Sequence, residues 1–150
     1  MILTLESVQA EHQRLGALIA QLTASAPTTL SISAADIVLR QGERYAGLLL
    51  DDAGKPLHHL LLLPGAAEDL TWQAALDWAK GQGGELPTRR EQSLLFANLK
   101  GEFEDRYYWS SEQYSAHDAW FQNFGLGDQG AYVKDDEYRA RAVRRFPVSA

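Results

Sequence analysis

Aromatic and polar side chains gather in one stretch of the chain, YYWSSEQYSAHDAWFQNFGLGDQG, which covers residues 107–130. Tryptophan and tyrosine join an apolar ring to a polar edge, so they serve either as core anchors or as platforms for a ligand. Trp109, Trp120 and Phe124 stand in strand-like surroundings, and we predict that they are core residues. The candidate ligand-binding residues lie in the polar parts of the stretch, and they are Tyr114, His117, Asp118, Gln122, Asn123, Asp128 and Gln129.

Histidines and carboxylates are the residues that could hold a metal ion. His58 and His59 are adjacent in a predicted strand, so their side chains point to opposite faces and cannot chelate one ion together. His117 is left as a candidate ligand, although satisfied structural histidines are the plainer interpretation. Calcium takes oxygen ligands, but the loop carboxylates lack the spacing of an EF-hand. These carboxylates are Asp118, Asp128, Asp135, Asp136 and Glu137.

Two further patterns suggest catalysis or nucleotide binding, and their context disfavours both. Ser110, Ser111 and Ser115 precede His117, but proximity in sequence does not establish the geometry of a triad. Residues 125–130, GLGDQG, match G-x-G-x-x-G, yet a dinucleotide site needs a helix next. Strand-like and turn-like residues follow instead, so we expect a glycine-rich loop between strands.

Composition limits the class of protein. A chain of 150 residues with 45% apolar content fits one globular domain with a real core. The formal net charge of -6 argues against a general nucleic-acid binder, and the cluster RARAVRR is better read as a set of internal ion pairs. The absence of cysteine excludes disulfide frameworks, zinc–thiolate sites and thiol nucleophiles. No basic leader or membrane span is recognisable at the start, so we expect a protein that is cytoplasmic at synthesis.

The elements that position these residues can be assigned from periodicity and turn chemistry. Strand-like patterns run over residues 30–63, beginning with LSISA, and the turn DDAGKP makes residues 45–64 a β-hairpin. At least one hairpin strand reads as buried on both faces. The segments AWFQNF and YRARAVRRF are each predicted to form one strand, and the last of them can return beside the hairpin.

Two helices are predicted between the hairpin and these later strands. Thr71 is a suitable N-cap for WQAALDWAK, which ends at Gly81. Thr88 and Glu91 have the spacing of a capping box at the start of the second helix, and Gly101 stands where a left-handed C-terminal residue belongs. The resulting order of elements predicts an α+β fold.

Residues 1–26 predict an additional amphipathic helix. Val8, Leu15 and Leu22 recur every seven residues, and Leu5, His12 and Ile19 form the adjoining row. The stripe fits either a short coiled coil that makes a homodimer or homotrimer, or packing onto the protein's own domain. Residues 27–41 are then a connector with the first strand, and residues 42–150 the main domain.

Three ordered blocks resemble a known family. GELPTRREQSLLFANLK, YYWSSEQYSAHDAWFQNF and RARAVRRF are similar to recurring blocks of the bacterial and phage domains related to the C-terminal domain of the Legionella collagen-like protein. The segments GERYAGLLLDDAGKPLHHLLLLPG and TWQAALDWAKGQGG look like its small prophage-encoded branch. The resemblance covers residues 42–146 and leaves out the N-terminal helix.

This resemblance implies a C-type-lectin-like fold, with two helices on a small twisted antiparallel sheet and a long loop region. Trp109, Trp120 and the LPTR turn at residues 86–89 would be structural, and the ligand surface would run over residues 112–118 and 125–137. The cysteines and the calcium-and-sugar motifs of animal lectins are missing, so calcium-dependent sugar binding is not implied. The active-site cysteines of the related formylglycine-generating enzymes are missing too.

We therefore expect a non-enzymatic binding module of phage or prophage type, without a cofactor, that recognises a protein or a glycan through its loop face. One alternative is an intracellular phage effector that blocks a host or rival-phage protein. A remote alternative is a metal-assisted hydrolase that uses His117 with nearby carboxylates. Neither nucleic-acid nor membrane binding is expected, and association with a virion is a further option for its location.

Overall fold

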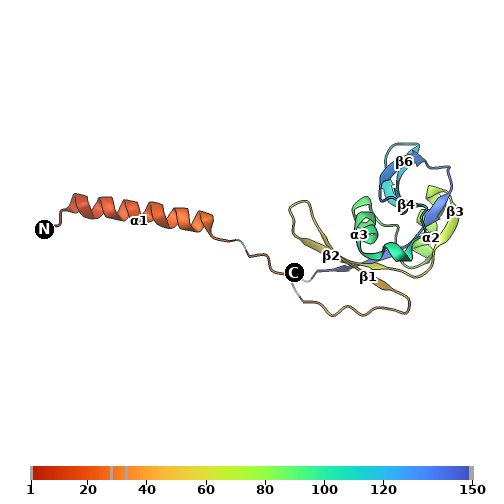
Figure 1. Cartoon of the computed structure of the whole chain (residues 1–150), viewed down its shortest axis with the longest axis horizontal. Helices are drawn as coiled ribbons and strands as arrows, with labels where there is room; N and C mark the ends of the chain where they lie inside the picture. The colour runs from red at the N-terminus through yellow and green to blue at the C-terminus, as the bar shows by residue number, and fades with distance from the viewer. Residues whose placement is uncertain (1, 28, 33, 149–150) are drawn as a thin grey trace. The chain divides into compact units, whose positions relative to one another are not determined.

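A computed structural model describes residues 2–27, 29–32 and 34–148, and the protein separates into two compact units, Met1–Ser31 and Ile32–Ala150. The first unit is built around helix α1, Leu5–Ser25 (Figure 1). Thr4 caps this helix, because its side chain accepts a hydrogen bond from the backbone N–H of Ser7. No residue of α1 is buried. The predicted N-terminal helix is confirmed.

A three-stranded antiparallel sheet opens the second unit. Strands β1, Arg44–Leu50, and β2, Pro56–Leu62, form the predicted hairpin, and β8, Val143–Pro147, pairs with the other side of β2 (Figure 1). The strand order is β1-β2-β8. Three successive residues, Leu60, Leu61 and Leu62, are buried. This confirms that β2 is covered on both faces and that the last strand returns beside the hairpin.

A five-stranded sheet carries the aromatic stretch. Its strands are β3, Ala67–Leu70, β4, Tyr107–Gln113, β5, Asp118–Asn123, β6, Gln129–Val133, and β7, Tyr138–Ala140. They follow the order β3-β7-β4-β5-β6, and only the contact of β4 with β7 is parallel. With the helices, the two mostly antiparallel sheets give the α+β class that the sequence predicts.

Two helices lie between β3 and β4 in sequence order. Helix α2, Trp72–Gly81, is capped by Thr71, and α3, Arg89–Leu99, is capped by Thr88 with a reciprocal bond from Glu91. Both predicted caps are therefore confirmed. Gly101 does not adopt the left-handed conformation that we predicted. Instead the backbone tightens into a single 3-10 turn, η1, Lys100–Glu102, which supplies the termination.

The helices cover separate parts of the core. Helix α2 packs on a cluster around Trp109, and α3 packs on a cluster around Phe124 and Tyr108. Trp109 is fully buried, and its indole N–H donates to the carbonyl of Leu70 at 2.7 Å. Phe124 is 1% exposed and stacks on Phe103 at a centroid distance of 3.8 Å. Both were predicted core residues, and both predictions are confirmed.

Two predicted strands differ from the structure. Residues 30–32 and 34 of LSISA form no strand, and residue 33 lies outside the described residues. The segment YRARAVRRF is wrong as one strand, because the backbone leaves the five-stranded sheet after Ala140 and enters the three-stranded sheet at Val143. The buried side chain of Arg141 fixes this crossing by donating to the carbonyls of Leu63 and Glu102.

Three of the four arginines of RARAVRR, namely Arg139, Arg144 and Arg145, make internal ion pairs, as predicted, but their partners lie far away in the sequence. Arg139 pairs with Glu68 and Glu104, and Arg144 grips Glu43 through two hydrogen bonds of 2.7 Å. The hydrogen bonds from Arg144 lower the pKa of Glu43 to about 2, against the opposing effect of burial.

Glu91 is the most enclosed of these carboxylates, with a side chain that is 0% exposed. Arg145 donates to both of its oxygens, at 2.9 and 2.7 Å, and the backbone N–H of Thr88 donates at 3.0 Å. The His58 ring adds a contact at 3.3 Å. Burial alone raises the pKa of Glu91, but the bonds from Arg145 and Thr88 outweigh it, so the pKa lies below its ordinary value. One carboxylate thus joins α3 to β2 and β8.

Glu91→Ala should lower the free energy of unfolding by about 3–5 kcal/mol, because it leaves the Arg145 guanidinium without its buried partner. The matched control is Glu85→Ala, which removes a second partner of Arg145 whose side chain is 62% exposed. That change should cost less than about 1 kcal/mol. Urea denaturation of both variants measures the difference, and equal losses would contradict the role given to Glu91.

Candidate functional site

Strand β5 presents two different faces. Ala119 and Phe121 point into the core cluster that contains Trp109. Trp120 and Gln122 alternate with them and therefore lie on the opposite face. On that face Gln122 pairs with Gln129 of β6 across the ladder. The candidate site lies on this second face of β5, which carries Trp120 and Gln122.

Trp120 is half-buried and is not the core residue that we predicted. The guanidinium carbon of Arg89 lies 3.5 Å from the centre of its ring, and the Tyr114 ring meets it edge-on at 5.2 Å. Alternation along β5 explains the correction, since the core side of the strand is already taken by its neighbours. We call Arg89, Trp120 and Tyr114 the aromatic stack.

Gln129 fixes the position of Arg89. Its side-chain oxygen accepts from Nε of Arg89 at 3.1 Å, and its side-chain N–H groups donate to the Arg89 carbonyl and to Gln122, both at 2.7 Å. Gln122 in turn donates to the carbonyl of Gly127 at 2.9 Å. Gln122 is 1% exposed, so it supports the surface from below and does not reach a ligand, contrary to our prediction.

The β5–β6 loop is the glycine-rich loop between strands that GLGDQG predicted. A strand follows it directly, which confirms that no helix starts there. Asn123 closes the loop, because its side-chain oxygen accepts from the N–H of Gly125 at 2.9 Å. Gly127 has φ +91°, and a β-carbon there would stand 2.8 Å from the Phe96 ring, so the position requires glycine. Asp128 is exposed on this loop.

The β4–β5 turn presents Tyr114 and His117. Both side chains are exposed, Tyr114 by 60%. The backbone N–H of Tyr114 donates to the Asp118 carbonyl at 3.0 Å. The hydroxyl of Ser115 accepts from the N–H groups of His117 and Asp118 at 3.2 and 3.0 Å. These bonds hold the turn in one conformation and so fix the direction of Tyr114.

The predicted site residues therefore divide between the two ends of β5. Tyr114, His117 and Asp118 lie at its start, whereas Asn123 and Asp128 lie at or beyond its end. A six-residue strand separates these ends by roughly 17 Å. Gln129 is the predicted residue that reaches the aromatic stack from β6, through Arg89.

Arg89 was missed as a residue of this surface, because the resemblance made the LPTR turn at residues 86–89 structural, whereas Glu112 lies within the predicted ligand surface, residues 112–118. Arg89 and Glu112 line a shallow hollow of about 390 Å³ together with Arg90, Ser93 and Gln129. The Glu112 carboxylate accepts from the backbone N–H of Arg89 at 2.6 Å. The N-cap at Thr88 was recognisable in the sequence, and it places Arg89 at the first helical position. Its contact with Trp120 depends on the packing of α3 against β5, which no local pattern reveals.

His58, His59 and Ser110 have structural contacts. His58 faces Glu91, and His59 lies on the other face of β2, where Nδ1 is 2.8 Å from the Tyr45 hydroxyl. The hydroxyl of Ser110 accepts from the N–H of Glu112 at 3.1 Å. Across the described ranges, no three His, Asp or Glu side chains are close enough together to hold a metal ion. The hydrolase alternative gains no support from these contacts.

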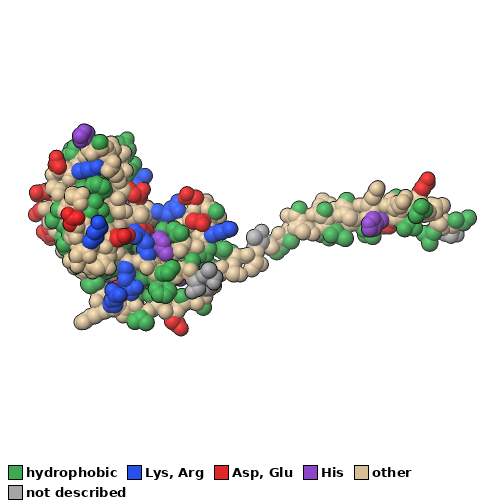
Figure 2. Space-filling view, turned by 180° about the vertical axis from the view of Figure 1, so that it is seen from behind, with side chains coloured by type: hydrophobic (Ala, Val, Ile, Leu, Met, Phe, Trp, Pro, Cys, Tyr) green, Lys and Arg blue, Asp and Glu red, His purple; other side chains and the backbone are tan. Residues whose placement is uncertain are grey.

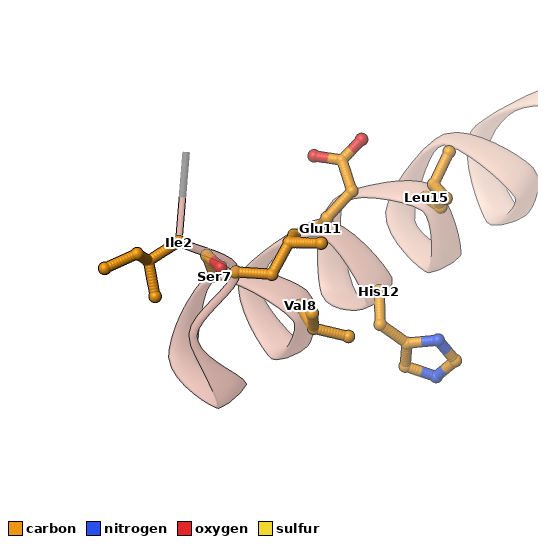
Figure 3. A pocket seen from close by; sticks show the side chains of 7 residues that line it. Ile2, Ser7, Val8, Glu11, His12 and Leu15 are labelled. Atoms are coloured by element: carbon orange, nitrogen blue, oxygen red, sulfur yellow. The ribbon is translucent and has the colours of Figure 1, made fainter.

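The N-terminal helix carries a second exposed feature. Apolar side chains are visible along this helix in Figure 2, and Figure 3 shows Val8 and His12 projecting from one side of it while Glu11 projects from the other. One row of side chains along this helix consists of Leu5, Val8, His12, Leu15, Ile19 and Leu22, and we call this row the seam. Its members are separated alternately by three and four residues, which is the heptad pattern of a coiled coil.

Comparison with known proteins finds no protein-family model and no curated protein that matches this sequence. The resemblance to lectin-like domains therefore depends on the motifs quoted above. In the described part of the protein, no helix combines the length and the apolarity that are needed to cross a bilayer.

Two aromatic substitutions should separate the core from the surface. Trp109→Ala should lower the free energy of unfolding by about 3–5 kcal/mol, because it opens a large cavity. Tyr114→Ala should cost less than about 1 kcal/mol, since most of that ring is exposed. Urea denaturation monitored by circular dichroism gives both values. Similar losses in the two variants would contradict the assignment of Tyr114 to the surface.

Proposed function

We propose that residues 42–150 form a non-enzymatic binding module of phage or prophage type with a C-type-lectin-like fold. The order of elements supports the fold: a hairpin, two helices, a loop-rich sheet, and a last strand that returns beside the hairpin. The blocks GELPTRREQSLLFANLK and RARAVRRF support it further, because Thr88 and Glu91 of the first block meet Arg145 of the second. The fold alone does not determine the partner.

The observation that carries the function is the aromatic stack. Tyr114 is largely exposed, yet its turn is closed by backbone hydrogen bonds and its ring rests against Trp120. Rigid aromatic side chains lose little entropy when they bind. Tyrosine, tryptophan and arginine are the residues enriched at the energetic centres of protein interfaces. A preformed platform of all three residue types suits recognition of a protein or glycan partner.

The polar neighbours of the stack are already engaged within the protein. Gln129, Gln122 and Glu112 hold Arg89 and the loops in place and so preorganise the platform. His117 at one end and Asp128 at the other are exposed and available for polar contacts at the rim. Preorganisation of this kind lowers the entropic cost of binding.

Affinity capture tests this proposal. Purified full-length protein should retain a partner from bacterial host lysate or envelope material, and Tyr114→Ala should lose most of it because the exposed ring is removed. Tyr132→Ala is the matched control, since Tyr132 is 52% exposed and lies on the other face of β6 from Gln129. Mass spectrometry identifies what is retained, and quantification compares the three proteins.

The outcomes separate the alternatives. Tyr114-dependent capture of one cytosolic protein would favour an intracellular effector, and capture of an envelope protein or glycan would favour adhesion. Capture that is equally strong in Tyr114→Ala, or equally weak in Tyr132→Ala, would contradict the aromatic stack as the binding surface.

We also propose that α1 associates with α1 of other copies. Six seam positions at alternating spacings of three and four residues form one apolar stripe, in which His12 is the single polar residue. A dimer or trimer would multiply weak single sites through avidity. Most of the stability of a helix in a protein comes from packing of its apolar face, so burial of the stripe would also stabilise α1.

Leu15→Glu should convert the full-length oligomer to a monomer, because it places a charge in the centre of the seam. Ala17→Glu is the matched control, since residue 17 lies outside the seam, and it should leave the oligomer intact. Sedimentation equilibrium measures the mass of each protein. A monomeric wild-type protein at high micromolar concentration would contradict self-association through α1.

A further inference from the structure

Arg89 is a cation that the protein holds firmly without giving it an ion pair. Its guanidinium carbon lies 3.5 Å from the Trp120 ring centre, and its Nε donates to Gln129 at 3.1 Å. Its backbone N–H and carbonyl are bonded to Glu112 and Gln129. Across the described ranges, its two terminal nitrogens have no hydrogen-bond partner and no carboxylate within ion-pair distance.

Other arginines of the same unit differ from Arg89, because their guanidinium groups are paired with carboxylates. Arg144 and Arg145 each bind a buried glutamate through two nitrogens, and Arg90 pairs with Asp52 beside Arg89. The protein has 20 acidic against 14 basic residues, so acidic partners are abundant. Arg89 instead lies over the Trp120 ring, and its side chain lines the shallow hollow described above.

We propose that the Arg89 guanidinium binds a carboxylate of a protein partner, either from an acidic side chain or from the partner's C-terminal residue, while Tyr114 packs against the carbon atoms next to it. The inference rests on the proposed function and names the chemistry of the ligand. Because Nε is occupied by Gln129, the ligand meets the two terminal nitrogens, which form the fork that a carboxylate matches with two parallel hydrogen bonds.

The neighbourhood favours a carboxylate over a phosphate. Glu112 lies in the same hollow, and its charge opposes every anion that approaches Arg89. A phosphate group carries about -1.5 to -2 charges at neutral pH, so both its attraction to Arg89 and its repulsion by Glu112 are about twice those of a carboxylate. The net charge of -6 adds a further repulsion, which also grows with the charge of the ligand. Arg90 lines the same hollow but is paired with Asp52, so the charge of Arg89 remains, and it suits a singly charged ligand.

An NMR titration of the full-length protein tests the inference. The probes are N-acetylglutamate N-methylamide for an acidic residue and N-acetylglycine for a terminal carboxylate, each added at constant ionic strength. We expect saturable shifts of the Trp120 indole and Arg89 Nε–H signals, with a Kd on the order of millimolar. N-acetylglutamine N-methylamide, which is neutral, should produce no saturable shift.

Variants of Arg89 and of an arginine outside the hollow provide the controls. Arg89→Lys keeps the charge but loses the fork, and should weaken binding of the carboxylate probe roughly tenfold. Arg89→Gln should abolish it. Arg44→Gln should bind like the wild type, because Arg44 lies on β1, outside the hollow, and is paired with Glu102. Preserved amide spectra of the variants show that they remain folded.

Specific results would overturn the inference: equal shifts with the neutral probe, tighter binding of inorganic phosphate than of either carboxylate, or unchanged binding by Arg89→Gln. These failures are distinguishable from failure of the proposed function. Tyr114-dependent capture that persists unchanged in Arg89→Gln keeps the binding module and removes the carboxylate. Absence of any Tyr114-dependent capture removes the binding module, whatever the titration shows.

Discussion

The buried Glu91 carboxylate is the contact on which the arrangement of the second unit depends. Its oxygens accept hydrogen bonds from the backbone N–H of Thr88, at the start of α3, and from two guanidinium nitrogens of Arg145, on β8. It also contacts the His58 ring, on β2. A buried carboxylate is tolerated only when its oxygens are fully hydrogen-bonded, so these partners have to be present together. The requirement fixes where the first turn of α3 lies relative to the three-stranded sheet.

The candidate site inherits its geometry from that turn. Arg89 follows the N-cap directly, so the position that Glu91 gives to α3 also brings the Arg89 side chain to Trp120 of β5. Gln129 then connects α3 with β6, and Gln122 extends the same network to the glycine-rich loop. The interior ion pair and the exposed aromatic stack thus share one helix end, with Glu91 directed inward and Arg89 outward.

Local signals in the sequence were sufficient for the hairpin, the capped helices and the core positions of Trp109 and Phe124. They failed where a long-range contact decides the outcome. LSISA alternates like a strand but pairs with none over its described residues, and residues 138–146 divide between two sheets because Arg141 finds its carbonyl partners there. Long-range packing also explains why Trp120, which we predicted in the core, lies at the surface, and why Gln122, which we predicted at the surface, is buried. Hydrophobicity suggested the tryptophan for the interior, but the alternation of β5 and the approach of α3 place it in the platform and the glutamine beneath it.

The crossing at Arg141 has a consequence for how the second unit opens. Only Arg141 and Ala142 separate β7 of one sheet from β8 of the other, and the buried guanidinium holds the carbonyls of Leu63 and Glu102. Neither sheet can come apart without pulling on the other through this short segment. Slowly exchanging amide protons in both sheets should therefore report the same opening free energy, as one cooperative unit, while the exposed turns at the ends of β5 exchange through smaller local fluctuations.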